Sequence, residues 1–257
     1  MGSFRFKQFE IVQDFSAMRV NTDAVLLGAW MSLPEGGTEG QPLRLLDIGT
    51  GTGVIALMAG QRLAGGGSVG VVEAVEIDEG ACNDAGRNFE AAPWEGVDFI
   101  LHKMSLQELS ESSPDRYDLV FTNPPYFIDS LKSSDDAKVL ARHTDTLSQR
   151  EILYHCARLV KPGGRLAVVL PVTEGEEFLR KVEFLMANTP HGENCFVLVR
   201  ICRVHTVERK PAKRLLMEFV LASAAQPKEK PHIGQLVMMS GNSKTAQYAD
   251  MVDGFYL

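Results

Sequence analysis

Leu43-Arg44-Leu45-Leu46-Asp47-Ile48 leads directly into Gly49-Thr50-Gly51-Thr52-Gly53, and the helix-like stretch 54–63 follows. The first run is short and apolar and stops at a glycine-rich turn, as a buried strand does. Glycines accept positive φ and let a ligand approach the backbone, and the first N–H groups of the next helix are free to bind it. The stretch therefore predicts a strand, a ligand-binding turn and a helix. The alternative interpretation is a tight turn without a ligand.

Strand-like and helix-like segments alternate after this unit. Further strands are predicted over residues 69–77, 97–102, 117–122 and 165–170, and helices over residues 79–90, 148–160 and 174–188. Residues 194–203 and 214–222 predict an antiparallel C-terminal hairpin at the sheet edge. This alternation favours βαβ units, so the predicted fold is a doubly wound, mostly parallel, seven-stranded α/β sheet with helices on both faces.

The composition is that of an ordinary globular protein, with 45% hydrophobic and 23% charged residues among 257. No apolar run reaches the roughly 18 residues of a membrane span, and the N-terminus lacks a signal-peptide pattern. A cytoplasmic location is expected. The four cysteines lack C-x-x-C spacing, so no metal is predicted. The net charge of −7 argues against a dedicated nucleic-acid binder but permits a local basic patch.

Glu76 ends the second predicted strand, and Ile77 follows it. A carboxylate in this place can accept both hydroxyls of a ribose, and Ile77 would then lie against an adenine ring. Alternatively, Glu76 or Asp78 caps the next helix, a role that suits Asp78 well. The nicotinamide fingerprint G-x-G-x-x-G fails, because residues 49–54 read G-T-G-T-G-V.

Asn123-Pro124-Pro125-Tyr126 follows the fourth predicted strand. The prolines fix φ and leave carbonyl groups as acceptors beside the Asn123 amide oxygen. A planar –NH₂ group offers two donors, which the carbonyls of Asn123 and Pro124 could receive. Tyr126 offers a ring on which a flipped base could stack. A rigid proline loop is the alternative.

In this order, the three motifs resemble those of class I S-adenosylmethionine methyltransferases that modify amino groups, a Rossmann-like fold. The blocks 15–30, 46–57 and 253–257 resemble bacterial tRNA1(Val) adenine-N6 methyltransferases, and the similarity runs over essentially the whole chain. The resemblance implies S-adenosylmethionine as cofactor and N6-methylation of the adenine 3′ of the anticodon in valine tRNA. The residues implied for catalysis are Asn123, Pro124, Pro125 and Tyr126, and those for the cofactor are Asp47, Gly49, Thr50, Gly51, Gly53, Glu76, Ile77, Ser105 and Asn123.

Ser105 is a departure from the wider class, whose members often carry an acidic residue there to contact the cofactor adenine. A hydroxyl can still bind the adenine amino group, but more weakly. We expect one methyltransferase domain over residues 1–257. It would comprise an N-terminal substrate-side segment (1–40), a catalytic core (41–222) and an extended, loosely held tail (223–257).

Basic residues gather at the tip of the predicted hairpin and predict contacts with the tRNA backbone. The proposed set is Arg203, Arg209, Lys210, Lys213 and Arg214, joined by Lys7 and Arg19 near the N-terminus and by Arg142 and His143 nearer the target base. Phosphate contacts supply much of the affinity for RNA. The alternative is a solvated loop. The protein is expected to be a monomer or a weak homodimer.

Two other functions compete. N5-methylation of a glutamine in a protein such as a release factor would use the same N-P-P-Y motif. Such enzymes usually carry a helical domain before the glycine turn, however, and only about 40 residues precede it here. A non-catalytic nucleotide-binding module, or a dehydrogenase, would leave N-P-P-Y unexplained.

Overall fold

The computed structural model describes residues 2–113, 116–124, 147–190, 192–223 and 229–257. Its strands are β1 (Ser3–Arg5), β2 (Glu10–Val12), β3 (Leu43–Ile48), β4 (Gly70–Glu76), β5 (Val97–Lys103), β6 (Tyr117–Thr122), β7 (Val160–Pro171), β8 (Asn194–Val207), β9 (Arg214–Ser223), β10 (His232–Ser240) and β11 (Ser243–Lys244). Its helices are α1 (Thr22–Trp30), α2 (Val54–Gly65), α3 (Glu79–Glu90), α4 (Leu106–Ser112), α6 (Gln149–Leu159), α7 (Val172–Asn188) and α8 (Ala246–Val252).

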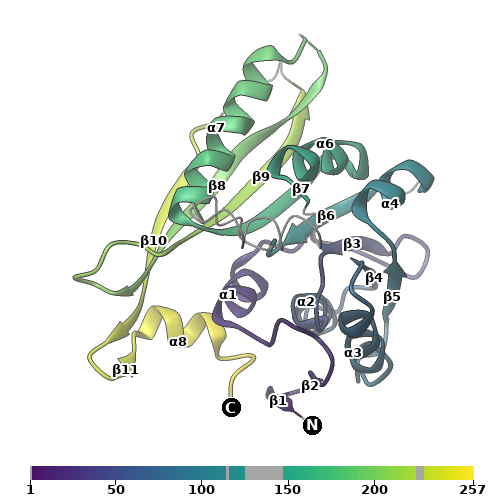
Figure 1. Cartoon of the computed structure of the whole chain (residues 1–257), viewed down its shortest axis with the longest axis vertical. Helices are drawn as coiled ribbons and strands as arrows, with labels where there is room; N and C mark the ends of the chain where they lie inside the picture. Colours follow the sequence, from purple (N-terminus) through teal and green to yellow (C-terminus); the bar gives the residue numbers. More distant parts are fainter. Residues whose placement is uncertain (1, 114–115, 125–146, 191, 224–228) are drawn as a thin grey trace, which may run out of the picture.

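The main sheet has the strand order β11-β10-β8-β9-β7-β6-β3-β4-β5 (Figure 1). Strands β3 to β7 pair in parallel, and β9 runs antiparallel to both β7 and β8. The mostly parallel sheet and the antiparallel C-terminal hairpin are confirmed, whereas the predicted number of seven strands is wrong, because β10 and β11 extend the sheet to nine within the described residues. Parallel pairing brings the carboxyl ends of β5, β4, β3 and β6 to one edge of the sheet, where ligands bind in such folds.

Two expectations about the C-terminus are wrong. The β8–β9 hairpin is not the sheet edge, because β10 pairs in parallel with β8, and β11 pairs with β10. The tail is not loosely held, because α8 follows these strands and buries Tyr248 and Val252. Apolar residues of the polar tail, Tyr248 and Val252 among them, join the core cluster that includes α1, and burial of those side chains stabilises the segment.

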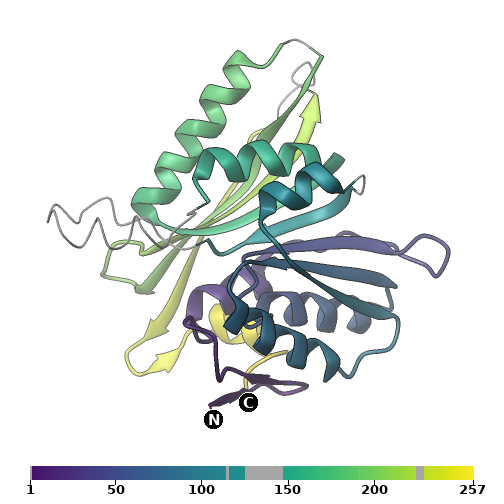
Figure 2. The same ribbon diagram turned by 45° about the vertical axis from the view of Figure 1, so that its right-hand side comes forward.

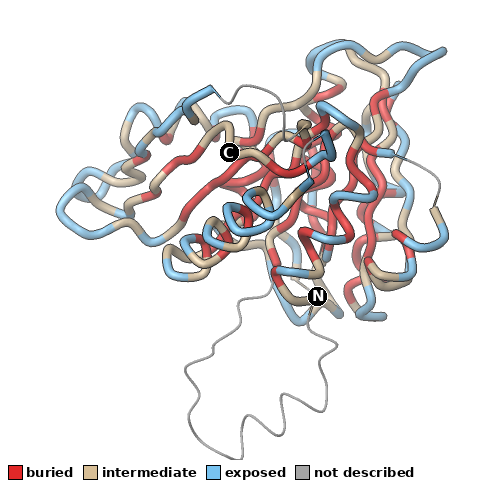
Figure 3. Tube along the Cα trace, turned by 90° about the horizontal axis from the view of Figure 1, so that it is seen from above, coloured by how far each residue is buried: buried red, intermediate tan, exposed pale blue. Residues whose placement is uncertain are grey.

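Helices cover both faces of the sheet, as expected (Figures 1 and 2). One core cluster joins α1, α2, α3 and α8 to the sheet, and a second joins α4, α6 and α7 to its other face. Figure 3 shows the buried positions concentrated along the strands between these two layers. The sequence predicted α2, α3, α6 and α7 but not α1 and α4, which are short.

The two ends of the chain lie beside each other (Figures 1 and 2). Lys7 N–H donates to the Phe255 carbonyl at 2.8 Å, and the Phe6 and Tyr256 rings stack at 6.1 Å between centroids. Gln61 of α2 donates to the Gly254 carbonyl at 2.7 Å. The closing segment therefore anchors the N-terminus to the core. Within the described ranges, no helix combines the length and apolar character needed to cross a membrane.

Candidate active site

The glycine turn between β3 and α2 has a backbone that only glycine adopts readily. Gly49, Gly51 and Gly53 have φ values of 66°, 57° and 82°. A Cβ atom on Gly49 or Gly51 would meet nothing within 4 Å, whereas one on Gly53 would lie 2.6 Å from the Phe89 ring. The first two glycines thus leave open space for a ligand, and the third allows close packing of α3.

Asp47 lies underneath this turn and is fully buried. Its Oδ2 accepts hydrogen bonds from the Thr50 hydroxyl at 2.7 Å and from the Ala56 N–H at 3.2 Å, while its Oδ1 has no hydrogen-bond partner. Burial raises the pKa of the Asp47 carboxyl to about 7, against the lowering effect of these two donors. The two hydrogen bonds join the turn to the first turn of α2. A direct contact of Asp47 with the cofactor stays a prediction.

Glu76 connects the end of β4 to the glycine turn. Its Oε2 accepts from the Gly51 N–H at 2.9 Å, and its Oε1 accepts from the N–H groups of Ile77 and Asp78 at 2.9 and 3.0 Å. The turn is also attached through the Gly49 N–H, which donates to the Val75 carbonyl at 2.9 Å. The carboxylate therefore stands at the rim of the open turn, and its contact with a ribose stays a prediction.

The two residues after Glu76 differ in the roles that the sequence left open, namely capping the next helix and packing against an adenine ring. Asp78 is the N-cap of α3, and its carboxylate accepts from the Ala81 N–H at 2.7 Å. Ile77 has an exposed fraction of 63%, unusual for a large apolar side chain beside a buried strand. Asp78 is thus a cap, whereas Ile77 presents an apolar surface on which a planar ring could pack.

Ser105 is the N-cap of α4 and forms a capping box with Glu108. Its hydroxyl donates to Glu108 Oε2 at 2.8 Å and accepts from the Glu108 N–H at 3.2 Å. The hydroxyl is therefore already used to begin the helix. Sequence reasoning missed this role although the signal, a serine followed three residues later by a glutamate, was present. A contact of Ser105 with adenine stays a prediction.

Asn123 and Pro124 follow β6 at the same sheet edge. Ile48 and Thr122 are register partners on β3 and β6, and the Thr122 hydroxyl donates to the Ile48 carbonyl at 2.9 Å. Asn123 is half-buried and Pro124 is buried. Asn123 therefore follows β6 at the same level at which Gly49 follows β3, so the two residues start neighbouring loops at one edge of the sheet. Pro125 and Tyr126 lie outside the described residues.

The predicted RNA contacts fall into different environments. Arg209, Lys210 and Lys213 are exposed between β8 and β9, as is Arg19 before α1. Since Arg214 pairs with Pro171 at the carboxyl end of β7, this tip lies at the edge that holds Asn123.

Three of the predicted cations have acidic neighbours within the chain. Arg214 Nε donates to Asp23 Oδ2 of α1 at 2.7 Å. Arg203 lies 3.8 Å from Glu176, and Lys7 Nζ lies 3.1 Å from Asp253 Oδ1. Their charges are partly compensated by these pairs. Arg142 and His143 lie outside the described residues.

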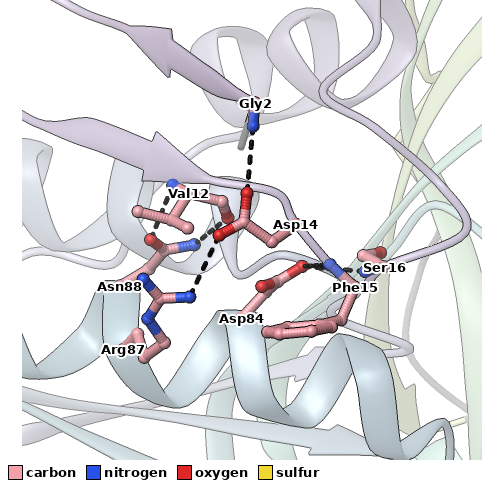
Figure 4. A network of polar contacts seen from close by, with 8 residues as sticks. All are labelled: Gly2, Val12, Asp14, Phe15, Ser16, Asp84, Arg87 and Asn88. Atoms are coloured by element: carbon pink, nitrogen blue, oxygen red, sulfur yellow. Dashed lines mark hydrogen bonds and ion pairs between the residues drawn. The ribbon is translucent and has the colours of Figure 1, made fainter.

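Sequence reasoning missed a polar cluster on α3 that holds the N-terminal segment (Figure 4). Asp84 and Asn88 are buried, and their side chains bind the backbone of residues 12–16. Their spacing of four residues was the available signal, because it places both on one face of a helix.

The comparisons with known proteins agree with this geometry. The methyltransferase small domain family matches residues 14–200. The chain is 39% identical over 257 residues to the tRNA1(Val) (adenine(37)-N6)-methyltransferase of Tolumonas auensis, with 99% of this chain and 97% of the relative covered. Identity to the enzyme of that name from Parabacteroides distasonis is 40% over 225 residues, covering 88% and 86%.

The chain belongs to the tRNA1(Val) (adenine(37)-N6)-methyltransferase family. Membership in this methyltransferase family confirms S-adenosylmethionine as the cofactor. The member from Trichodesmium erythraeum is 37% identical and aligns with 100% of this chain and 98% of its own length.

Solved structures show the same fold at low identity. A predicted O-methyltransferase from Agrobacterium tumefaciens superposes with a TM-score of 0.58 at 16% identity and covers 91% of this chain and 96% of its own. A protein from Listeria monocytogenes assigned to the class I S-adenosylmethionine-dependent methyltransferases gives 0.53 at 17% identity, covering 83% and 62%. The expected class I methyltransferase fold is thereby confirmed.

Proposed function

We propose that this protein transfers a methyl group from S-adenosylmethionine to N6 of an adenine in tRNA, namely the adenine 3′ of the anticodon in valine tRNA. The observation that carries the proposal is the pairing of Ile48 with Thr122. This pairing puts the start of the N-P-P-Y motif beside the open glycine turn, so an amino group held at Asn123 lies next to the cofactor.

The residues present fit the cofactor. The Cβ positions of Gly49 and Gly51 face open space, Glu76 stands at the rim, and Ile77 is exposed. Glu76 would accept the ribose hydroxyls and Ile77 would pack on the adenine ring. When bound, S-adenosylmethionine supplies a methyl group that its sulfonium has already activated, so the protein needs no strong general base.

Asn123 and Pro124 would hold the target nitrogen. Their carbonyl oxygens accept the two amino protons, which orients the nitrogen and draws its lone pair away from the ring. Positioning of this kind can supply a large part of a rate enhancement. Pro125 and Tyr126 complete the motif, with Tyr126 stacking on the base. Residues 41–222 thus act as the catalytic core.

The exposed cations at the edge would bind the RNA. Arg19, Arg209, Lys210 and Lys213 are the best placed of the predicted cations, because no ion pair within the described residues involves them. Arg203 and Arg214 were predicted with them but pair with Glu176 and Asp23. Arg142 also belongs to the predicted set. A tRNA substrate places the protein in the cytoplasm, and we expect a monomer or a weak homodimer.

The test is incubation of the purified protein with labelled S-adenosylmethionine and either tRNA from a strain lacking the enzyme or a release factor. Mass spectrometry of nucleosides should find N6-methyladenosine in valine tRNA. Label in the release factor instead would favour glutamine methylation. Asn123→Ala should lower the turnover of tRNA by about 10²–10³, the usual cost of one well-aimed polar contact in a site that excludes water, and should retain cofactor binding.

A further inference from the structure

Asn88 of α3 joins the N-terminal segment to the glycine turn, and Figure 4 shows its contacts with Val12 of that segment. Its Oδ1 accepts from the Val12 N–H at 2.8 Å, and its Nδ2 donates to the Val12 carbonyl at 2.9 Å. The same Nδ2 donates to the Thr52 carbonyl at 2.9 Å. Asn88 is 2% exposed, its bond to Thr52 is buried, and its two bonds to Val12 are partly buried. One side chain thus connects two segments 40 positions apart in the sequence.

Asp84 holds the next part of that segment, one helical turn nearer the site. It is fully buried, and its Oδ2 accepts from the N–H groups of Phe15 and Ser16 at 2.9 and 2.8 Å. Its Oδ1 has no hydrogen-bond partner. Helix α3 and this segment are closely packed, because a Cβ atom on Gly80 of the helix would lie 2.7 Å from the Phe15 carbonyl oxygen. Burying a carboxylate for two backbone bonds is costly, so packing alone does not account for it.

Residues 16–21, the strap, must cross the end of α2 that carries the glycine turn. The strap starts on α3 at Ser16 and ends at Asn21, which caps α1 by accepting from the Ala24 N–H at 3.0 Å. Helix α2 lies between, because α1 packs on it at Gly28 and α3 packs on the turn at Gly53.

The strap is held by hydrogen bonds of its own. The Ser16 hydroxyl donates to the Met18 carbonyl at 2.9 Å, and the Val20 N–H donates to Gln13 Oε1 at 2.9 Å. These bonds tie the strap to the segment that Asp84 and Asn88 hold. Arg19, one of the predicted tRNA contacts, lies on its exposed part, residues 17–19.

We propose that Asp84 and Asn88 are positioning residues that hold the strap over the glycine turn, so that cofactor binding and strap order are coupled. The identity of the cofactor rests on the proposed function. Because Asn88 Nδ2 is shared between Val12 and Thr52, an adjustment of the turn on binding reaches the segment that leads into the strap. Coupling of this kind is reciprocal, so loss of the strap contacts weakens cofactor binding.

The test uses Asn88→Ala and Asp84→Ala, with Arg87→Ala as the matched control on the same helix. Arg87 is half-exposed and pairs with the side chain of Asp14 at 3.3 Å, whereas Asp84 and Asn88 bind the backbone of the segment. Trypsin cleavage after Arg19 is followed by mass spectrometry with and without S-adenosylhomocysteine, and cleavage after Arg209 serves as the internal reference. Calorimetry gives the affinity for S-adenosylhomocysteine.

In the wild type and in Arg87→Ala, S-adenosylhomocysteine should slow cleavage after Arg19 but not after Arg209. The two alanine variants should be cleaved after Arg19 about tenfold faster and bind S-adenosylhomocysteine about tenfold more weakly, as expected for loss of one buried polar partner. Asp84→Asn keeps an acceptor toward the strap and should stay within about threefold of the wild type.

Equal cleavage after Arg19 with and without S-adenosylhomocysteine in the wild type would overturn the proposal, whether or not the alanine variants fold. Unchanged affinity in folded Asn88→Ala would do the same. Neither readout uses tRNA, so a failure of the proposed RNA substrate would leave these results readable and would be seen separately in the methylation assay.

Discussion

The Thr122 hydroxyl donates a hydrogen bond to the Ile48 carbonyl at 2.9 Å, between two register partners on neighbouring parallel strands. Ile48 precedes the glycine turn, and Thr122 precedes Asn123. Both residues are buried. The bond therefore fixes the separation between the two segments that must meet for methyl transfer, and it acts at the level of the last residue of each strand.

Thr122→Val keeps the shape of the side chain and removes this bond. The Ile48 carbonyl then lacks its partner in a buried place, which should cost about 1–3 kcal/mol of stability. We expect a lower melting temperature, a kcat reduced about tenfold and little change in affinity for S-adenosylhomocysteine. Thr122→Ser keeps the hydroxyl and is the control. A normal kcat in Thr122→Val, measured well below its melting temperature, would show that the spacing tolerates the loss.

Glu76→Ala should weaken S-adenosylhomocysteine binding roughly 10- to 100-fold, the range for losing hydrogen bonds to a charged group. Part of this loss would come from the Gly51 N–H, which Glu76 also accepts. The 2′-deoxy analogue of the ligand separates the two contributions. Wild type should prefer the ribose form, and Glu76→Ala should lose the preference. An unchanged preference in the variant would exclude the ribose role.

The central fold could be predicted because its signals are local. The apolar run before Gly49, the cap at Asp78 and the β-branched run before Glu76 each fix a strand end or a helix start through nearby residues. Parallel pairing then brings those ends to one edge without further information. The order of the motifs in the sequence is therefore largely enough to predict where the candidate site lies, and also that Gly49 and Asn123 are close together.

Other features depend on contacts between distant segments, which no local pattern reveals. In the sequence, strand β10 looks like part of a polar tail, and only its parallel pairing with β8 makes it a strand. The sequence suggests that Arg214 is an unpaired cation, but the fold places Asp23 beside it. The sequence suggests that Asp84 lies on the surface of a helix, but residues 15 and 16 cover it in the structure. In each case the deciding partner lies far away in the chain.

Asp47 should make stability depend on pH. Burial raises its pKa to about 7 from an ordinary value of 3.8. Between these two values the folded state holds a proton that the unfolded state has released, so stability falls as the pH rises through this window. The full effect is on the order of 4 kcal/mol between pH 4 and pH 8.

Asp47→Asn removes the titrating group and keeps an acceptor for Thr50 and Ala56. The difference in unfolding free energy between wild type and variant, measured by denaturant titration at several pH values, isolates Asp47. The wild type should lose stability relative to Asp47→Asn as the pH increases from 4 to 8. A flat difference would mean that the carboxyl stays ionised throughout.

The hairpin tip should bind phosphate through its exposed cations and not through Arg214. Lys210 and Lys213 are exposed and lie at the edge that holds Asn123, whereas Arg214 is paired with Asp23 at 2.7 Å. Each phosphate contact releases counterions, so the slope of log affinity against log salt reports the number of contacts, at about 0.7–0.9 per contact. Lys210→Ala with Lys213→Ala should therefore reduce this slope for valine tRNA by about 1.5 and leave the affinity for S-adenosylhomocysteine unchanged.

Arg214→Ala is the matched comparison. It should lower the melting temperature, because it leaves the partly buried Asp23 without this partner, but it should change the salt slope little. If the double lysine variant keeps the wild-type slope, or if Arg214→Ala flattens the slope as much, the tRNA backbone does not contact the tip in this way.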